Sequence, residues 1–449
     1  MPPDEIDAHA QRAAQAAAHL RAAPAGPLAL AKRTSNLFRD RRRGQRQRLD
    51  LGAMNHVLGC DRRAGWVDAE GMTTYDDLVA WTLPHGAMPA VVPQLKTITV
   101  GGAAAGVGIE ATSFRHGLVH DTLHEIEVLL PDGQMVVCTP DNRYSDLFFG
   151  FPNSYGTLGY ALRLRAGIIP VQPLVHVRHH RYAQAEPFFD ALATACRGEA
   201  DFIDGVVFGP HEHVLSLGRF AAHAPWRSDY TYQHIYYRSL QARDEDYLGT
   251  HDYIWRWDTD WFWCSKNFGA QQPLVRRLLG RGRLNSRTYT RWMRWNARWR
   301  LSQRMARVRG LHPESVIQDV DIPLRHAPQF LAFLQREIGI APLWICPLRP
   351  EIPGRHFPLY PLPAQPLYVN FGFWDVVQSR VAWPADHFNR LVENEVMRLH
   401  GIKSLYSDSF FSREEFSASY GMAEYERLKA KYDPSGRAPH LYDKCVRRA

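Results

Sequence analysis

Residues Thr99–Gly108 read TVGGAAAGVG, with four glycines and three alanines in ten positions. They follow the run Val91–Val100, VVPQLKTITV, which is rich in β-formers and predicts a strand that ends at the paired glycines. Backbone so bare of side chains can approach a flat or phosphorylated ligand closely and donate N–H groups to phosphate oxygens. The same bareness suits a tightly packed, bent strand, and the spacing alone favours neither interpretation.

A dinucleotide fingerprint is one way to interpret these glycines. Gly106–Ala111 fits the pattern GxGxxA, and Glu127 lies about twenty residues further on. That fingerprint requires its second and third small residues to open a helix whose N-terminus meets the pyrophosphate. Thr112, Ser113 and Gly117 interrupt any such helix. We therefore reject the Rossmann interpretation.

Local signals predict several elements around this stretch. Thr73 or Thr74 is a suitable N-cap for a helix that Gly86 ends. Apolar β-formers flank the turn Pro131-Asp132-Gly133 and predict a β-hairpin. Ser412 and Glu415 are spaced as a capping box, so a helix should run from there to about Lys431. We also expect an N-terminal surface helix, a short helix at Tyr144–Phe149 and a strand at Leu158–Ile169.

Length and composition bound the class of protein. A chain of 449 residues is too long for one hydrophobic core, and 45% hydrophobic with 22% charged residues is typical of a folded globular protein. No apolar run approaches the roughly 18 residues of a membrane span, and the N-terminus lacks the pattern of a signal peptide. Six scattered cysteines without a CxxC pair indicate free thiols in a reducing cytoplasm.

The net charge of +8 suits an anionic partner, such as nucleic acid, a phosphorylated cofactor or an acidic membrane surface. No nucleic-acid-binding motif accompanies the charge, so we expect no nucleic-acid partner. Histidines cluster in three places, but neither HExxH nor cysteine partners complete a ligand set, so we expect no metal site. These clusters are His176/His179/His180, His211/His213 and His116/His120.

Longer patterns resemble a known family. The run VVPQLKTITVGGAAAGVGIEATSFRHGLVHDTLHEIEVLLPDG, followed by YSDLFFGFPNSYGTLGYALRLR, resembles the FAD-binding domain of the vanillyl-alcohol oxidase/PCMH superfamily. LAKRTSNLFR, GMTTYDDLVAWTLPHG and the tail LYSDSFFSREEF…YDPSGRAPHLYDK resemble its sterol Δ24-reductase-like branch. That branch includes bacterial enzymes that act on methylated or methylene-bearing fatty acyl chains. The resemblance covers residues 28–170 densely and 400–445 clearly, and it is thin between them.

The resemblance implies an α+β fold. Residues 1–175 would form a PCMH-type FAD-binding lobe, 176–400 an α+β cap over the substrate, and 401–449 a segment that returns to the FAD lobe. The loop Lys32–Phe38 takes the place of the family's pyrophosphate loop. The implied FAD contacts are Lys32, Arg33, Thr34, Ser35, Asn36, Leu37, Thr99, Val100, Gly101, Gly102, Gly106, Val107, Gly108, Ser113, Gly117 and Tyr160.

The mode of FAD attachment is predicted from the same loop. Many members of the superfamily attach the flavin through a histidine or cysteine, and the loop Lys32–Phe38 contains neither. We therefore expect non-covalent FAD. His116 is the residue that leaves a covalent link open.

Reduction of a carbon–carbon double bond needs a proton donor beside the flavin. Asp408, next to Tyr406 in LYSDSF, is the first candidate, because the resemblance returns this segment to the flavin. Glu110, in the glycine-rich segment, is the second. A cap or turn role for Asp408 is an equal alternative, and pairing with an arginine is the preferred alternative for Glu110.

The resemblance predicts an oxidoreductase that reduces or forms a C=C bond in a long-chain lipid, such as a methylated or methylene-bearing acyl chain of a phospholipid or a sterol-like molecule. NADPH or a separate protein would supply electrons. The alternative is an oxidase of a lipid-linked or small alcohol. A lipid-binding protein with a degenerate flavin fold is a third possibility, which the intact KRTSNLF and TVGG segments disfavour.

Two tryptophan-rich stretches stand out in the middle of the chain. In Thr288–Gly310 a helix would place Trp292, Trp295 and Trp299 on one side and arginines opposite. That pattern suits an anionic membrane surface, reached as a peripheral protein at the inner face of the membrane. A cap helix that packs its tryptophans into the core is the slightly preferred alternative. Tyr253–Phe268 could line an apolar tunnel or form core.

Overall fold

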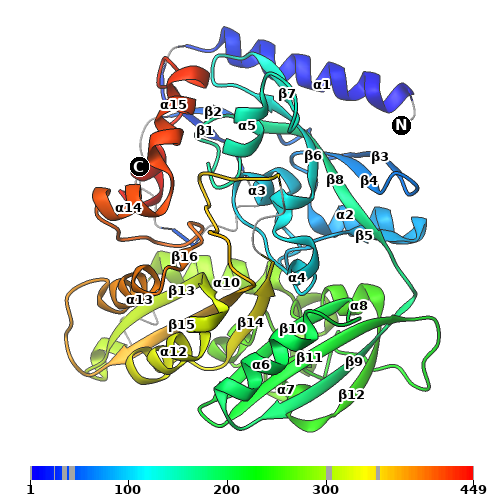
Figure 1. The fold of residues 1–449 in the computed structure, drawn as a ribbon, viewed down its shortest axis with the longest axis vertical. Helices are drawn as coiled ribbons and strands as arrows, with labels where there is room; N and C mark the ends of the chain where they lie inside the picture. The colour runs from blue at the N-terminus through cyan, green and yellow to red at the C-terminus, as the bar shows by residue number, and fades with distance from the viewer. Residues whose placement is uncertain are drawn as a thin grey trace.

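The computed structural model describes residues 3–24, 26–32, 38–39, 46–299, 306–349 and 354–447. Two β-sheets organise these residues into two lobes, which Figure 1 shows one above the other. The upper lobe contains the N-terminal third of the chain together with the C-terminal helices. The lower lobe contains the intervening part of the chain.

The first lobe is built on a sheet of order β3-β4-β8-β6-β7, with β5 also paired to β8. Its strands are β3 Val57–Asp61, β4 Trp66–Glu70, β5 Ala87–Pro89, β6 Leu123–Leu129, β7 Met135–Cys138 and β8 Tyr160–Pro170. A separate parallel pair joins β1 Leu28–Leu30 to β2 Gln47–Leu49. The α-helices are α1 Pro3–Ala22, α2 Tyr75–Thr82, α3 Val100–Ala105, α4 Ser113–His116 and α5 Ser145–Gly150, and the 3-10 helices are η1 Leu83–His85 and η2 Val119–Thr122.

The elements that strong local signals predicted are present in this lobe. The Thr74 hydroxyl accepts a hydrogen bond from the amide of Asp77 and caps α2. Gly86 ends the following 3-10 turn in the left-handed conformation, with φ of 69°. Strands β6 and β7 pair antiparallel across the predicted turn, in which Gly133 has φ of 89°. The predicted helix, hairpin, short helix α5 and strand β8 are therefore confirmed.

The prediction of a strand before the glycines is wrong. Residues 91–98 form turns and loop, and the glycine pair lies inside helix α3. The Thr99 hydroxyl accepts a hydrogen bond from the amide of Gly102 at 3.1 Å and so caps the helix. Three consecutive alanines then favour helix, and the amide of Gly106 donates to the carbonyl of Gly102. The cap and the alanines outweigh the β propensity of the preceding residues.

The second lobe is built on an antiparallel sheet of order β12-β9-β11-β10-β14-β15-β13-β16. Its strands are β9 Leu174–Tyr182, β10 Phe202–Gly209, β11 Glu212–Ala221, β12 Glu245–Gly249, β13 His312–Pro323, β14 Leu343–Leu348, β15 Tyr368–Ser379 and β16 Ile402–Lys403. This large sheet, together with the mixed first lobe, confirms the predicted α+β fold.

One face of the large sheet is covered by helices. Phe188 and Leu192 of α6 Ala185–Ala195, Phe330 of α12 Ala327–Phe333 and Val392 of α13 His387–Arg398 pack there in one buried cluster. Other helices in the described part of the lobe are α7 Tyr236–Ala242, α8 Thr250–Ile254, η3 Cys264–Phe268, α9 Pro273–Leu279, η4 Arg281–Arg283, α10 Ser286–Trp299, η5 Leu324–His326 and η6 Leu334–Ile338. The opposite face of β13, β14 and β15 lines the cavity described below.

The C-terminal segment consists of α14 Arg413–Ser419, α15 Met422–Tyr432 and α16 Leu441–Cys445. Ser412 and Glu415 form the predicted capping box. The expectation of one helix from there to Lys431 is wrong, because Gly421 takes a left-handed φ of 52° where the chain passes the carbonyl of Pro358.

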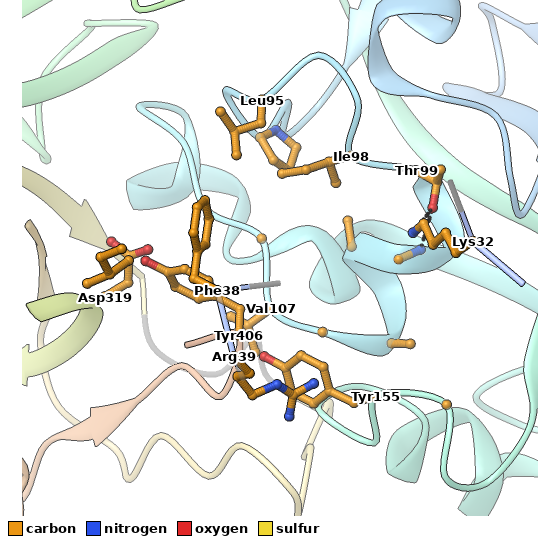
Figure 2. A pocket seen from close by; sticks show the side chains of 18 of the residues that line it. Lys32, Phe38, Arg39, Leu95, Ile98, Thr99, Val107, Tyr155, Asp319 and Tyr406 are labelled. Carbon is orange, nitrogen blue, oxygen red and sulfur yellow. Dashed lines mark hydrogen bonds between the residues drawn. The ribbon is translucent and has the colours of Figure 1, made fainter. Parts of the chain in front are cut away.

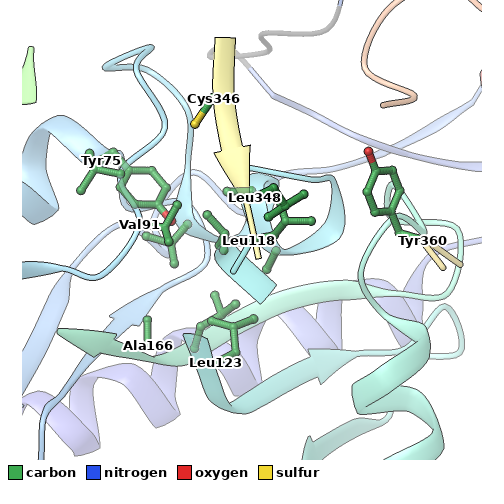
Figure 3. Close-up of a cluster of buried hydrophobic side chains, with 14 of the residues drawn as sticks. Tyr75, Val91, Leu118, Leu123, Ala166, Cys346, Leu348 and Tyr360 are labelled. Carbon is green, nitrogen blue, oxygen red and sulfur yellow. The ribbon is translucent and has the colours of Figure 1, made fainter. Parts of the chain in front are cut away.

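The two lobes share a core. Cys346 and Leu348 of β14 pack among Leu118 and Leu123 of the first lobe, as Figure 3 shows. In the described part of the chain, no helix has the length and apolar character needed to cross a membrane.

Candidate functional site

A large cavity, with a volume of about 1410 Å³, lies where residues of both lobes meet. The first lobe contributes Lys32, Phe38, Arg39, Arg46, Thr99, Gly101, Gly102, Gly106, Val107, Gly108, Tyr155, Gly156, Gly159 and Tyr160 to its lining. The second lobe contributes Trp261, Phe262, Trp292, Trp344 and Trp374 with a row of residues from β13 and β15, and Tyr406 and Lys444 come from the C-terminal part.

The glycine-rich segment forms one wall of the cavity. Behind this wall the glycines pack closely: a Cβ at Gly101 would lie 2.7 Å from the carbonyl oxygen of Gly71, and one at Gly108 would lie 2.7 Å from Val119. The close packing that one interpretation expected is present, although in helix α3 and not in a bent strand. The contact of this bare backbone with a ligand stays a prediction.

Cationic side chains gather along the same wall. The Lys32 ammonium donates a hydrogen bond to the Thr99 hydroxyl at 2.9 Å, as Figure 2 shows. The Arg39 guanidinium lies 4.8 Å from the ring centroid of Tyr155, and the Lys444 ammonium donates to the Tyr155 carbonyl. Arg46 also lines the cavity. Such a wall can bind a diphosphate through charge and backbone N–H groups.

Part of the predicted diphosphate loop lies outside the described residues. This applies to Arg33, Thr34, Ser35, Asn36 and Leu37. The residues on either side, Lys32 and Phe38, both line the cavity. The role of the loop between them stays a prediction.

Three other predicted FAD contacts do not line the cavity. Val100 and Ser113 are buried in the first lobe, where the Ser113 hydroxyl accepts from the amide of Glu110 at 3.1 Å. Gly117 packs against the carboxylate of Asp121. Tyr160 does line it.

The opposite wall is the open face of the large sheet. Strand β13 pairs with β15 so that Ile317 lies opposite Trp374 and Ser315 opposite Val376, and all four side chains line the cavity. Trp344 of β14 and Phe262 extend this wall, with the rings of Phe262 and Trp374 centred 4.5 Å apart. This aromatic surface is suited to an apolar or planar ligand.

A carboxyl group lies within the aromatic wall. Asp319 of β13 is hydrogen-bonded to Tyr406, whose hydroxyl oxygen in turn accepts from the indole of Trp374 at 2.8 Å. Figure 2 shows Asp319 and Tyr406 side by side. Gly372 lies opposite Asp319 in the sheet, where a Cβ would be 2.7 Å from Asp319 Oδ1. The missing side chain at 372 makes room for this carboxyl.

Asp319 is unusually hard to ionise. Burial raises the pKa of Asp319 to about 7, the charge of Asp321 acts in the same direction, and the hydrogen bond with Tyr406 opposes them. Its Oδ1 is buried without a hydrogen-bond partner in the described part of the chain. A carboxyl with these properties can hold or release a proton near neutral pH.

The proton donor that the sequence predicts, Asp408 or Glu110, is not the carboxyl that lies in the cavity. Tyr406 lines the cavity, but neither Asp408 nor Glu110 is among the described residues that do. The carboxylate of Glu110 pairs with Arg256 at 2.8 Å and accepts from Gln94, which matches the arginine-partner alternative. The carbonyl of Asp408 accepts from the ammonium of Lys403 ahead of α14.

Sequence reasoning did not find Asp319, Arg39 or Trp374. In β13, Asp319 and Asp321 alternate with Val320 and Ile322. This alternation is typical of a strand with one face in water, so the sequence does not set these carboxyls apart. Among the described residues, no group of three or more His, Cys, Asp or Glu side chains is arranged to hold a metal ion.

Known proteins resemble this chain in two ways. Residues 8–139 match the family described as an FAD binding domain. The chain is 24% identical to the Δ24-sterol reductase of Arabidopsis thaliana over 456 residues, which cover 90% of this chain and 77% of the relative. It is 28% identical to that of Homo sapiens over 421 residues, covering 88% and 76%.

A shorter similarity, 33% identity over 149 residues, links 32% of the chain to 28% of cytokinin dehydrogenase 7 from rice, Oryza sativa subsp. japonica. The matched FAD binding domain includes the glycine-rich wall and the cationic residues Lys32, Arg39 and Arg46 of the cavity. The chain is an FAD-binding oxidoreductase that is distantly related to the Δ24-sterol reductases.

Proposed function

We propose that this protein binds FAD without a covalent link and uses it to reduce or form a carbon–carbon double bond in a long-chain lipid. The observation that carries the proposal is one cavity with two unlike walls. A cationic wall of bare backbone faces an aromatic wall that holds a protonatable carboxyl, Asp319. The first suits the diphosphate and ribityl chain of a dinucleotide, and the second suits an apolar reactant.

The residues present fit the cofactor. Lys32, Arg39, Arg46 and Lys444 would neutralise the diphosphate, and the backbone from Thr99 to Gly108 would run beside the flavin and ribityl chain. The residues that line the described cavity include no histidine and one cysteine, Cys264. Burial raises the pKa of the Cys264 thiol, which disfavours the thiolate that a covalent bond would need. Both points support non-covalent binding.

FAD, when bound, supplies the hydride chemistry, and the protein must orient the reactants and manage the proton. Asp319 is the proposed proton carrier, because it stays protonated up to about pH 7. Tyr406 and Trp374 orient its carboxyl through hydrogen bonds. The tryptophans around them exclude water from the reacting bond.

The apolar wall supports a lipid as the reactant. Trp261, Phe262, Trp344 and Trp374 offer aromatic surface, and the relatives that match most of the chain are named Δ24-sterol reductases. A fatty acyl chain or a sterol-like molecule would bury its hydrocarbon there at about 25 cal/mol per Å².

An alcohol oxidase is the second candidate. Above about pH 7 the Asp319 carboxylate would act as a base toward an alcohol, and the similarity to a cytokinin dehydrogenase adds an oxidative relative. Such an enzyme would consume oxygen and need no NADPH.

Spectra of the FAD-loaded protein under anaerobic conditions test these alternatives. A reductase is bleached by NADPH or by a partner reductase without substrate, whereas a desaturase is bleached by the saturated lipid and reoxidised by oxygen. Bleaching by an alcohol, but not by NADPH, a partner reductase or the saturated lipid, would contradict the main proposal and establish the second candidate.

A substitution tests the proton carrier. Asp319→Asn should lower kcat for C=C reduction by about 10²–10⁴-fold and abolish the decline of kcat above pH 7. Asp375→Asn is the matched control, because Asp375 also lines the cavity but pairs with Lys266 at 2.7 Å. If both variants keep the wild-type pH profile, Asp319 is not the proton carrier.

A further inference from the structure

Positive charge is concentrated in one segment of the chain. Residues 261–313 contain thirteen of the 54 Lys and Arg residues and none of the 46 Asp and Glu residues. The rest of the chain therefore has a formal net charge of −5, although the whole chain has +8. The positive net charge of the whole chain therefore depends on this basic segment.

Three arginines in the described part of the basic segment are exposed and have no salt-bridge partner among the described carboxylates, whereas Arg276 is buried and Arg281 and Arg287 pair with Asp229 and Asp76. Arg277 of α9, Arg283 of η4 and Arg291 of α10 are exposed, and no described carboxylate forms a salt bridge with any of them. Helix α9 also exposes Leu274 and Leu278, at 69% and 74%. These two leucines are four residues apart and share one face of the helix. An exposed apolar face among unneutralised arginines is unusual for a surface that meets only water.

The same segment borders the mouth of the cavity. Among the residues that line the cavity, Trp295 of α10, Ser315 of β13, and Val376 and Gln378 of β15 are exposed, so the cavity opens to solvent beside them. Trp295 is 57% exposed at this rim. One turn earlier on α10, Trp292 lines the interior and packs near Trp261. Two tryptophans of α10 therefore line the cavity, one at its exposed rim and one in its interior.

We propose that the described part of the basic segment from α9 to Trp295 of α10 docks on an anionic lipid bilayer and turns the cavity mouth toward it. Arg277, Arg283 and Arg291 would meet lipid phosphates, while Leu274, Leu278 and Trp295 would enter the interfacial region. The substrate would then pass from the bilayer into the cavity without crossing water. The inference rests on the proposed lipid substrate. Nucleic acid would also meet the charge, but it does not account for exposed leucines or for a cavity mouth rimmed by tryptophan.

Vesicle sedimentation of the FAD-loaded protein tests the proposal. The vesicles are neutral phosphatidylcholine, or phosphatidylcholine mixed with phosphatidylglycerol, and they contain no substrate. We expect salt-sensitive binding to the mixed vesicles only. Arg277→Glu/Arg283→Glu/Arg291→Glu should weaken this binding about 100-fold or more. The variant Leu274→Ser/Leu278→Ser/Trp295→Ser should lose the component of vesicle binding that persists at high salt.

Arg63→Glu/Arg178→Glu/Arg197→Glu is the matched control, with the same charge change at exposed positions outside the basic segment. It should bind like the wild type. Equal binding to neutral and mixed vesicles, or an equal loss in the control, overturns the proposal. The proposal is also overturned if the protein binds no vesicles but binds an RNA or single-stranded DNA oligonucleotide, and if the triple arginine variant loses that binding. The vesicle measurement requires neither substrate nor turnover. Its result can therefore be interpreted even if the proposed redox function is wrong.

Discussion

Adjacent glycines at the start of α3 have different roles. A Cβ at Gly101 would meet the backbone of Gly71, with its carbonyl oxygen at 2.7 Å and its Cα at 3.1 Å. A Cβ at Gly102 would meet the Lys32 ammonium and the Thr99 hydroxyl, each at 2.8 Å. Backbone cannot move aside, whereas the end of a lysine side chain can. The first glycine therefore serves the fold and the second serves the cavity.

Alanine substitutions should separate these roles. Gly101→Ala should lower the free energy of unfolding by about 1–3 kcal/mol, because the backbone of Gly71 must shift. Gly102→Ala should leave the unfolding midpoint nearly unchanged but weaken FAD binding, because Lys32 is displaced from Thr99. Thermal unfolding of the FAD-free protein and an FAD titration measure the two effects. Equal loss of stability in both variants would contradict this assignment.

The position of the acid shows where residue-level prediction from sequence ends. The sequence favours Asp408 because the resemblance returns its segment, next to Tyr406, to the flavin. The structure brings Asp319 to the Tyr406 hydroxyl instead, from nearly ninety residues away, through the pairing of β13 with β15 and β16. Proximity along the chain says little about which side chains meet across a sheet. The glycine-rich wall, by contrast, is a single continuous segment, and its place in the cavity could be anticipated.

At the scale of elements, α1 is attached to the first lobe by a buried ionic cluster. His9 lies 2.9 Å from Glu70 and 2.8 Å from Glu127. Burial acts to lower the pKa of His9, but the hydrogen bonds and charges of the two carboxylates outweigh it and raise the pKa to about 9. Burial acts to raise the pKa of Glu70, but its hydrogen bonds from His9, His56 and Arg12 lower it to about 2.

This cluster predicts a pH window for the attachment of α1. The raised pKa of His9 stabilises the fold fully below pH 6.5, and that contribution is lost as the pH rises through 9. The lowered pKa of Glu70 stabilises the fold above pH 4.5, and that contribution is lost as the pH falls through 2. His9→Gln should cost about 1.5–3 kcal/mol at pH 6 and less at pH 10. Urea unfolding at the two pH values measures this, and an equal cost at both would contradict it.

The elements that could be predicted are those with their own local signals. Helix α2 has a threonine cap and a glycine stop, and the β6–β7 hairpin has a Pro-Asp-Gly turn. Helix α3 does not follow from the sequence in this way, because Thr-Val-Gly-Gly favours strand or loop; the cap at Thr99, the alanines after it and the close packing on Gly71 favour the helix. The break at Gly421 was missed for the same reason, since it depends on the distant carbonyl of Pro358.

On the scale of the whole molecule, the lobes are joined by a buried charge cluster as well as by apolar packing. The Arg256 guanidinium is 2% exposed and lies 2.8 Å from Glu110 of the first lobe and 2.7 Å from Asp204 of the second. Such a cluster tolerates little displacement, because each group depends on the others for its solvation. The cluster therefore links the two lobes through buried charges.

Removal of this arginine should damage the whole molecule. Arg256→Met leaves two buried carboxylates without their counter-charge, and we expect a loss of about 3–5 kcal/mol in the free energy of unfolding. Arg219→Met removes an exposed ion pair with Glu199 and should cost less than about 1 kcal/mol. Denaturant unfolding of the two variants measures the difference. Similar costs would show that the interface does not depend on the buried charges.

The absorbance spectrum of the purified protein, after incubation with excess FAD and removal of the unbound cofactor, tests the central claim most directly. The cavity and the matched FAD binding domain predict a yellow protein with about one FAD per chain, and acid precipitation should leave the colour in the supernatant. Colour that stays in the precipitate would contradict non-covalent binding. A colourless protein that takes up no FAD would contradict the account as a whole.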